Sequence, residues 1–201
     1  MYDKNEVHVL ARETVFQGHF KIDRLRLRHR LYEGGMGAEI VREVFDRGHA
    51  VAVLPYDPTR DEVVLVEQFR IGPYVGDDPP WQLEIVAGLV EDAKDPVAVV
   101  HREAAEEAGL ELGELVPIVD YYSSPGATTE RIGVYCARVD TDGVGGVHGL
   151  PEEGEDIRVV VMSCDEAQAA LAEGRILASP AIIALQWLAL NREALRRRWQ
   201  T

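Results

Sequence analysis

The chain has 201 residues, of which 46% are hydrophobic, and its 35 acidic and 21 basic side chains give a formal net charge of −14 at pH 7. This length is sufficient for one hydrophobic core with a small appended unit. Nucleic-acid binding is disfavoured, because it requires a basic surface for the phosphates. An acidic enzyme can still take an anionic substrate when metal ions and a few arginines reverse the local field.

The cysteines and the apolar segments indicate where the protein works. Cys136 and Cys164 are the only cysteines, and their spacing fits neither a disulfide framework nor a metal site. Cys136 lies in an apolar strand pattern, which predicts a buried position. The N-terminal sequence MYDKNEVHVL lacks the apolar region of a signal peptide, and no apolar run approaches the ~20 residues of a membrane span. We therefore expect a cytoplasmic protein with no membrane partner.

Residues 1–47 alternate apolar and polar side chains in the manner of short β-strands. Leu25 and Leu27 alternate with arginines, and the pattern stops at a pair of glycines before it resumes at 40–45. The segment is too small to bury a core of its own, so it should pack on the rest of the chain or on a second copy. We predict a small N-terminal antiparallel β domain over 1–47 and a larger domain over 48–201.

The larger segment reads as strands and helices in alternation. Strand patterns occupy 51–57, 63–70, 81–88, 115–122, 131–138 and 157–162. The first two flank a short turn and predict a β-hairpin. Ser163 and Glu166 have the spacing of a capping box, and a last helix begins at Ser179. This order predicts an α/β fold, a mixed sheet sandwiched between helices in an α/β/α arrangement.

One further helix, between Asp95 and Gly109, carries the chemistry. Asp95 suits an N-cap, Pro96 suits the first helical position, and Gly109 suits the C-terminal cap. Its apolar face is predicted from helical spacing and comprises Val97, Val100, Ala104 and Ala108. Glu103, Glu106 and Glu107 lie three and four residues apart and crowd one patch of the helix. Like charges at this spacing destabilise a helix, so a bound hard cation such as Mg²⁺ or Mn²⁺ is a natural explanation.

The stretch GLVEDAKDPVAVVHREAAEEAGL, residues 88–110, resembles the Nudix box, G-x5-E-x7-R-E-U-x-E-E-x-G-U with U an aliphatic residue. The matching positions are Gly88, Arg102, Glu103, Ala104, Glu106, Glu107, Gly109 and Leu110. Lys94 stands where the motif has its first glutamate, and Glu91 or Asp92 could substitute for it. The intact second half of the motif is the half that resembles a metal site.

The rest of the chain is similar to the bacterial ADP-ribose pyrophosphatases of the Nudix superfamily. The similar segments are ARET, RGHAV, PYDP, the SPG loop, HGLPEEGEDIRV and IALQWL. Pro125 lies sixteen residues after Gly109, similar to a downstream proline associated with ADP-ribose specificity. The resemblance implies a Nudix fold and metal-dependent hydrolysis of ADP-ribose to AMP and ribose 5-phosphate in a homodimer with a swapped N-terminal domain.

The resemblance also implies roles for individual residues. It implies a metal site for two or three Mg²⁺ ions, with Mn²⁺ possible, formed by the Ala87 carbonyl, Glu103, Glu107 and Glu155. The catalytic group comprises Glu153 as general base, with Glu106 and Arg102. The substrate-binding group comprises Arg42 from the partner subunit, Arg70, Gly126, Glu130 and His19. Without the motif, the glutamates at 152–155 would read as a solvated acidic loop.

Other functions are compatible with the same residues. Within the class, the alternative is hydrolysis of another nucleoside diphosphate sugar, such as GDP-mannose. A non-catalytic ADP-ribose-binding module is a second alternative, which Lys94 supports and the carboxylates at Glu103, Glu107 and Glu153 oppose. A structural dimer with an acidic helix is the third, and the acidic loop opposes it.

Overall fold

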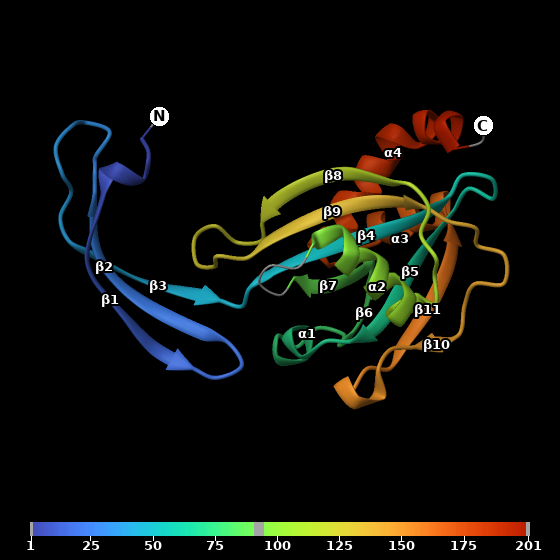
Figure 1. Cartoon of the computed structure of the whole chain (residues 1–201), viewed down its shortest axis with the longest axis horizontal. Coiled ribbons are helices and arrows are strands. Elements are labelled where there is room, and N and C mark those ends of the chain that lie inside the picture. The colour runs from blue at the N-terminus through green and yellow to red at the C-terminus, as the bar shows by residue number, and fades with distance from the viewer. Residues whose placement is uncertain (1, 91–94, 200–201) are drawn as a thin grey trace. The chain divides into compact units, whose positions relative to one another are not determined.

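The computed structural model describes residues 2–90 and 95–199, and the chain divides into two compact units (Figure 1). The first unit combines Met1–His49 with Tyr122–Arg131, and the second combines Ala50–Tyr121 with Ile132–Thr201. Lys94, Glu91 and Asp92 lie outside the described residues. The domain boundary between residues 47 and 48 stays a prediction.

The first unit is built on a three-stranded antiparallel sheet, as the alternating pattern predicts. After a 3-10 helix, η1 (Lys4–Glu6), its strands are β1 (Val7–Gln17), β2 (Lys21–His29) and β3 (Ile40–Asp46). The buried Asp23 on β2 accepts hydrogen bonds from Thr14, at 2.7 Å, and from Arg12. These contacts lower the pKa of Asp23 to about 2. Every residue of β1 is exposed, so this sheet buries little apolar surface by itself.

The second unit contains a mixed sheet, in which the central strands β4 and β9 run parallel. Its order is β10-β11-β5-β4-β9-β8, with β6 paired to β5 and β7 paired to β4. The strands are β4 (His49–Asp57), β5 (Glu62–Phe69), β6 (Trp81–Glu84), β7 (Val86–Val90), β8 (Leu115–Tyr122), β9 (Arg131–Arg138), β10 (Val147–His148) and β11 (Ile157–Ser163). The hairpin predicted from residues 51–70 is formed by β4 and β5.

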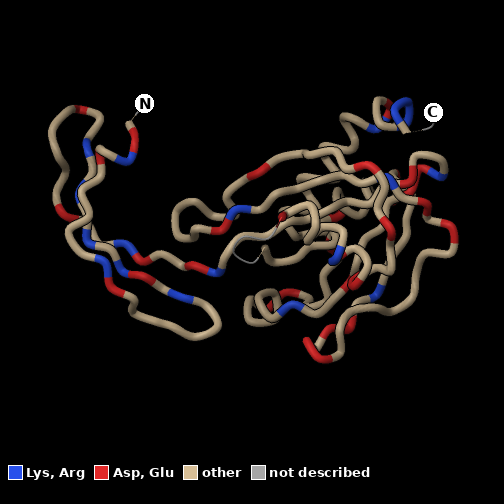
Figure 2. The backbone as a smooth tube through the Cα atoms, viewed as in Figure 1, with Lys and Arg blue, Asp and Glu red and all other residues tan. Residues whose placement is uncertain are grey.

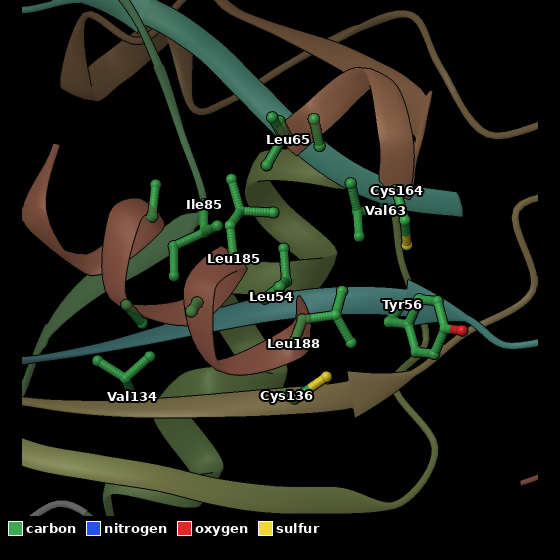
Figure 3. Close-up of a cluster of buried hydrophobic side chains, with 14 of the residues drawn as sticks. Leu54, Tyr56, Val63, Leu65, Ile85, Val134, Cys136, Cys164, Leu185 and Leu188 are labelled. Carbon is green, nitrogen blue, oxygen red and sulfur yellow. The ribbon is translucent and has the colours of Figure 1, made fainter. Parts of the chain in front are cut away.

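Helices cover both faces of this sheet because its buried strands are apolar on both sides. On β4, Val53 packs toward α2 (Pro96–Ala108), whereas Leu54 packs in the opposite cluster, under α3 (Cys164–Ala172) and α4 (Ser179–Trp199). Figure 1 shows α2 on one side of the sheet and α3 and α4 on the other. The α4 side chains in the opposite cluster include Leu185 and Leu188, drawn in Figure 3. The predicted α/β/α arrangement is therefore confirmed.

The helix that carries the acidic cluster has the predicted ends. The Asp95 side chain accepts a hydrogen bond from the Val97 amide at 3.0 Å, and Gly109 closes the helix at φ 63°. The predicted apolar face is wrong at Val97, which is 38% exposed, because the buried side chains of α2 begin at Val99. Val99 is buried in its place, beside the predicted Val100, Ala104 and Ala108.

The remaining departures from the sequence prediction are local. The single strand expected over 81–88 is divided at Ile85, because its first half, β6, pairs with β5 and its second half, β7, pairs with β4. The segment between the strand patterns at 63–70 and 81–88 contains a short helix, α1 (Ile71–Val75). The acidic loop before β11 contains β10 and a 3-10 turn, η2 (Pro151–Glu153). The Ser163 capping box and the buried Cys136 are confirmed. None of the helices in the described ranges is long and apolar enough to cross a membrane.

Candidate active site

Arg102 organises two of the three carboxylates on α2. Its guanidinium donates hydrogen bonds of 2.6 Å to Glu103 and 2.6 Å to Glu106. These bonds offset the repulsion between carboxylates that lie within one helical turn of each other. The side chain of Glu103 is 13% exposed, whereas that of Glu106 is 29% exposed. The arginine therefore positions a nearly buried carboxylate beside a more accessible one.

Glu107 is the most deeply buried acid of this cluster, at 3% exposure. Its carboxylate accepts a hydrogen bond of 3.1 Å from the Ala87 amide, which connects α2 to β7. Burial raises the pKa of Glu107 from its ordinary value of 4.5 to about 8, and the charges of Glu103 and Glu155 add to the increase. A buried carboxyl with this perturbation marks a functional site and favours a compensating cation.

Gly88 stands against Glu103, which explains why the motif begins with glycine. A Cβ atom at position 88 would lie 2.0 Å from the Glu103 carboxylate oxygen Oε1 and 2.4 Å from its Cγ. The pKa of Glu103 is raised, first by burial, with Glu106 and Glu155 adding to the effect and Arg102 opposing it. Glycine thus allows β7 to approach the helix closely enough for Glu103 to lie over the strand.

Replacing Gly88 tests this close approach. We expect Gly88→Ala to displace the Glu103 carboxylate and to lower turnover by at least ten-fold, because 1 Å misplacements in active sites are costly. Gly72→Ala is the matched control, since a Cβ there would meet no atom within 4 Å. Steady-state assays of both variants provide the measurement. Equal activity of Gly88→Ala and Gly72→Ala would contradict the assigned contact.

The acidic loop between β10 and β11 is attached to the same helix. The Gly149 amide donates a 3.1 Å hydrogen bond to the Glu106 carbonyl oxygen, and the Leu150 amide donates one of 3.0 Å to the Glu155 carboxylate. Negative charges line this loop in Figure 2. Glu153, on η2, lies with Glu155 and Arg70 along a pocket of about 350 Å³. The fold therefore brings the predicted base and a predicted metal ligand to one cavity.

Arg70, just after β5, is oriented by Glu84 on the neighbouring strand. The Arg70 guanidinium donates two hydrogen bonds, of 3.0 and 2.8 Å, to one oxygen of Glu84. The pKa of Arg70 is raised, because Glu84, Glu107 and Glu155 together outweigh the effect of burial. The arginine is thus held in its charged form beside the carboxylate cluster.

The predicted site residues divide between the two units. The second unit brings together Arg70, Ala87, Arg102, Glu103, Glu106, Glu107, Glu153 and Glu155. The first unit contains His19, Arg42, Gly126 and Glu130. Glu130 is buried and forms an ion pair of 3.3 Å with Arg47, whereas Arg42 is exposed and donates to the Val41 carbonyl oxygen. His19 packs edge to face against Phe20. The functional roles of the residues in both units, including substrate binding by these four residues of the first unit, stay predictions.

The carboxylate cluster fits a divalent cation by its chemistry. Its donors are oxygens, and burial, with the charge of neighbouring carboxylates adding to it, raises the pKa of both Glu103 and Glu107 above the ordinary value. Among the described residues, no three His, Cys, Asp or Glu side chains are already arranged around a common metal position.

Two residues beside the site were not predicted from the sequence. Glu84 orients Arg70, and Gln68 lines the pocket beside Glu153 and Glu155. The signal for Gln68 is the period-2 pattern of its strand, because it occupies a polar position beside apolar residues on the same face. On β5 that face continues from Val64 and Val66 to Gln68.

The class of protein follows from comparison with known families. The NUDIX domain matches residues 46–185, which include the glutamates of α2 and the acidic loop. The chain belongs to this family, and it is a Nudix hydrolase. Hydrolysis by enzymes of this type depends on divalent metal ions.

Individual relatives narrow the class. The chain is 46% identical to the ADP-ribose pyrophosphatase of Escherichia coli (strain K12) over 198 residues, covering 98% of this chain and 95% of that protein. It is 38% identical to the ADP-ribose pyrophosphatase of Haemophilus influenzae, covering 99% and 93%. The chain is 39% identical to the GDP-mannose pyrophosphatase of Pectobacterium atrosepticum over 157 residues, covering 76% of this chain and 78% of that protein. A crystal structure of an ADP compounds hydrolase matches the whole fold with a TM-score of 0.74 at 18% identity.

Proposed function

We propose that this Nudix hydrolase cleaves the pyrophosphate bond of ADP-ribose to give AMP and ribose 5-phosphate. The observation that carries the proposal is the similarity to ADP-ribose pyrophosphatases over 98% of the chain, including the first unit. Similarity to the GDP-mannose pyrophosphatase covers 76% of the chain. The full-length match therefore favours ADP-ribose over another nucleoside diphosphate sugar.

The proposed metal site is formed by Glu103, Glu107, Glu155 and the carbonyl oxygen of Ala87, and it would hold two or three Mg²⁺ ions. Hard oxygen donors suit Mg²⁺, and Mn²⁺ fits the same donors. When bound, such cations neutralise the phosphate oxygens and acidify the attacking water. Arg102 keeps Glu103 in place, and the Ala87 amide keeps Glu107 in place.

The other residues of the cluster supply proton transfer and orientation. Glu153 accepts the proton of the attacking water, and its position on a loop lets it approach once substrate is bound. Arg70, with its guanidinium plane fixed by Glu84, donates to phosphate oxygens of the substrate. Glu106 lies on α2, where its side chain accepts a hydrogen bond from Arg102 and its carbonyl oxygen accepts one from the Gly149 amide of the acidic loop. Each role depends on a contact within the second unit.

One assay tests the proposed substrate. Purified protein with Mg²⁺ is incubated with ADP-ribose, GDP-mannose and other nucleoside diphosphate compounds, and released monophosphates are quantified. We expect kcat/KM for ADP-ribose to exceed the others by at least ten-fold. A higher value for GDP-mannose would overturn the substrate assignment, and binding of ADP-ribose without product would favour the non-catalytic alternative.

We also propose a homodimer in which the first unit contributes residues to the partner's site. The sheet of that unit exposes apolar side chains that include Val9, Phe16 and Val41. Exposed apolar groups on so small a sheet favour burial against another chain. Arg42, on β3, is the side chain proposed to reach the substrate of the partner subunit.

Mixing two inactive variants tests this arrangement. Arg42→Ala and Glu107→Gln chains, refolded together, should regain about a quarter of the wild-type activity, since half of the dimers would be mixed and each would hold one intact site. The activity of the mixture is compared with that of each variant refolded alone. Loss of activity in Arg42→Ala without recovery on mixing would show that Arg42 acts within its own chain.

A further inference from the structure

Gln68 is a buried polar residue beneath the candidate site. It lies near the end of β5, is 6% exposed, and shares the strand face of Val64 and Val66, which pack under α2. Its Nε2 atom is fully buried and has no hydrogen-bond partner among the described residues. Among the described residues, no other buried side-chain nitrogen or oxygen atom lacks a hydrogen-bond partner.

An amide group in this condition requires a physical explanation. A buried donor without an acceptor loses its hydrogen bonds to water and gains nothing in exchange, so such groups are rare in native proteins. The neighbouring Gln82, directly opposite on β6, shows the ordinary solution, because its Nε2 donates to the Pro79 carbonyl oxygen. Gln68 therefore lacks the kind of acceptor that its neighbour Gln82 has.

The pocket beside Gln68 contains the acceptors that could supply it. Its lining includes Gln68, Arg70, Trp81 and three acids of the loop, namely Glu153, Glu155 and Asp156. Glu155 is electrostatically coupled to Arg70 and Glu107, whereas Glu153 is exposed on η2. The Leu150 amide uses one of the two Glu155 oxygens. The other Glu155 oxygen is thus the acceptor in this lining that could take a hydrogen bond from Gln68.

We propose that Gln68 is a positioning residue that donates a hydrogen bond to the Glu155 carboxylate when the site holds divalent cations. This inference rests on the proposed metal site. Hydrogen bonds from neighbouring groups orient metal ligands, and their loss typically weakens metal affinity by ~10–100-fold. Gln68 and Leu150 would hold the Glu155 carboxylate from two sides, and the unpartnered amide would gain its acceptor only in the metal-bound protein.

Direct binding of Mn²⁺ without substrate tests the proposal. Electron paramagnetic resonance titrations measure the affinity for wild type, Gln68→Met, Glu155→Gln and the double variant. We expect Gln68→Met to bind Mn²⁺ about ten-fold more weakly. Adding Gln68→Met to Glu155→Gln should cause little further loss, because the two residues act through one contact.

Thermal unfolding separates positioning from ordinary structural support. Gln68→Met should melt no lower than wild type in chelator, because the substitution removes an unpartnered donor. Added Mn²⁺ should raise its melting temperature by less than that of wild type. Gln82→Met is the matched control, since Gln82 is also buried but its amide is satisfied. It should melt at a lower temperature with and without metal and should bind Mn²⁺ normally.

The possible failures are distinguishable. Normal Mn²⁺ affinity in Gln68→Met with weakened binding in Glu155→Gln would overturn the role of Gln68 and leave the metal site standing. Normal affinity in both variants would overturn the assignment of Glu155 as a ligand, and this inference with it. A raised KM for ADP-ribose at normal Mn²⁺ affinity would make Gln68 a substrate contact instead.

Discussion

Glu103→Gln and Glu107→Gln should each reduce metal-dependent hydrolysis of ADP-ribose by at least 10³-fold while the fold persists. The amide keeps the size of the side chain and can still accept the hydrogen bond from the Ala87 amide at position 107. It removes the negative charge that balances a cation in a buried site. Turnover at saturating Mg²⁺ is the measurement, and near-wild-type activity in both variants would refute the metal-site assignment.

The same variants should not be less stable without metal. The pKa of Glu107 is raised to about 8, so between pH 4.5 and 8 the folded protein binds more protons than the unfolded chain. The free energy of unfolding of the metal-free protein therefore decreases as pH rises through this range. Glu107→Gln removes this contribution, and its melting temperature in chelator should vary less with pH than that of wild type.

Thermal melts from pH 5 to pH 8 in chelator provide that comparison. Glu166→Ala is a control outside the cluster, because Glu166 belongs to the capping box of α3. It should lower the melting temperature by weakening the cap and should leave hydrolysis unchanged. A parallel pH dependence in wild type and Glu107→Gln would contradict the assignment of the raised pKa.

Most of the architecture was predictable, because capping residues and hydrophobic patterns indicate the same helices and strands that the structure contains. The ends of α2 follow from Asp95 and Gly109, and the strands 115–122 and 131–138 match β8 and β9. The division at Ile85 was not predictable, because a continuous apolar run does not tell with which neighbouring strand each half pairs. The exposure of Val97 depends on which segments pack against the first turn of α2, which helical spacing does not encode.

The site was predictable where its residues share one segment. Arg102, Glu103, Glu106 and Glu107 are assembled by helical spacing alone. Contacts between distant segments required the structure, because sequence gives no distance between β7 and α2 or between the end of β5 and β6. Gly88 against Glu103 and Arg70 with Glu84 are the two examples that shape the site.

The general base is expected to be Glu153, and three single substitutions on the acidic loop test this. Glu153 lines the pocket with Arg70 and Glu155, whereas the exposed Glu152 does not line it. Loss of a general base costs ~10²–10⁴ in rate. Glu153→Gln should therefore lower kcat within that range with little change in KM, and its Mg²⁺ requirement should stay unchanged because no metal ligand has been removed.

Glu155→Gln should instead raise the Mg²⁺ concentration needed for half-maximal activity, since this residue is assigned to the metal and its carboxylate is fixed by the Leu150 amide. Glu152→Gln is the matched control on η2 and should retain wild-type kcat. Measurement of kcat against Mg²⁺ concentration for the three variants separates the roles. If Glu152→Gln were severely impaired while Glu153→Gln worked normally, the base would be the neighbouring residue, and η2 would have to rotate to bring it into the pocket.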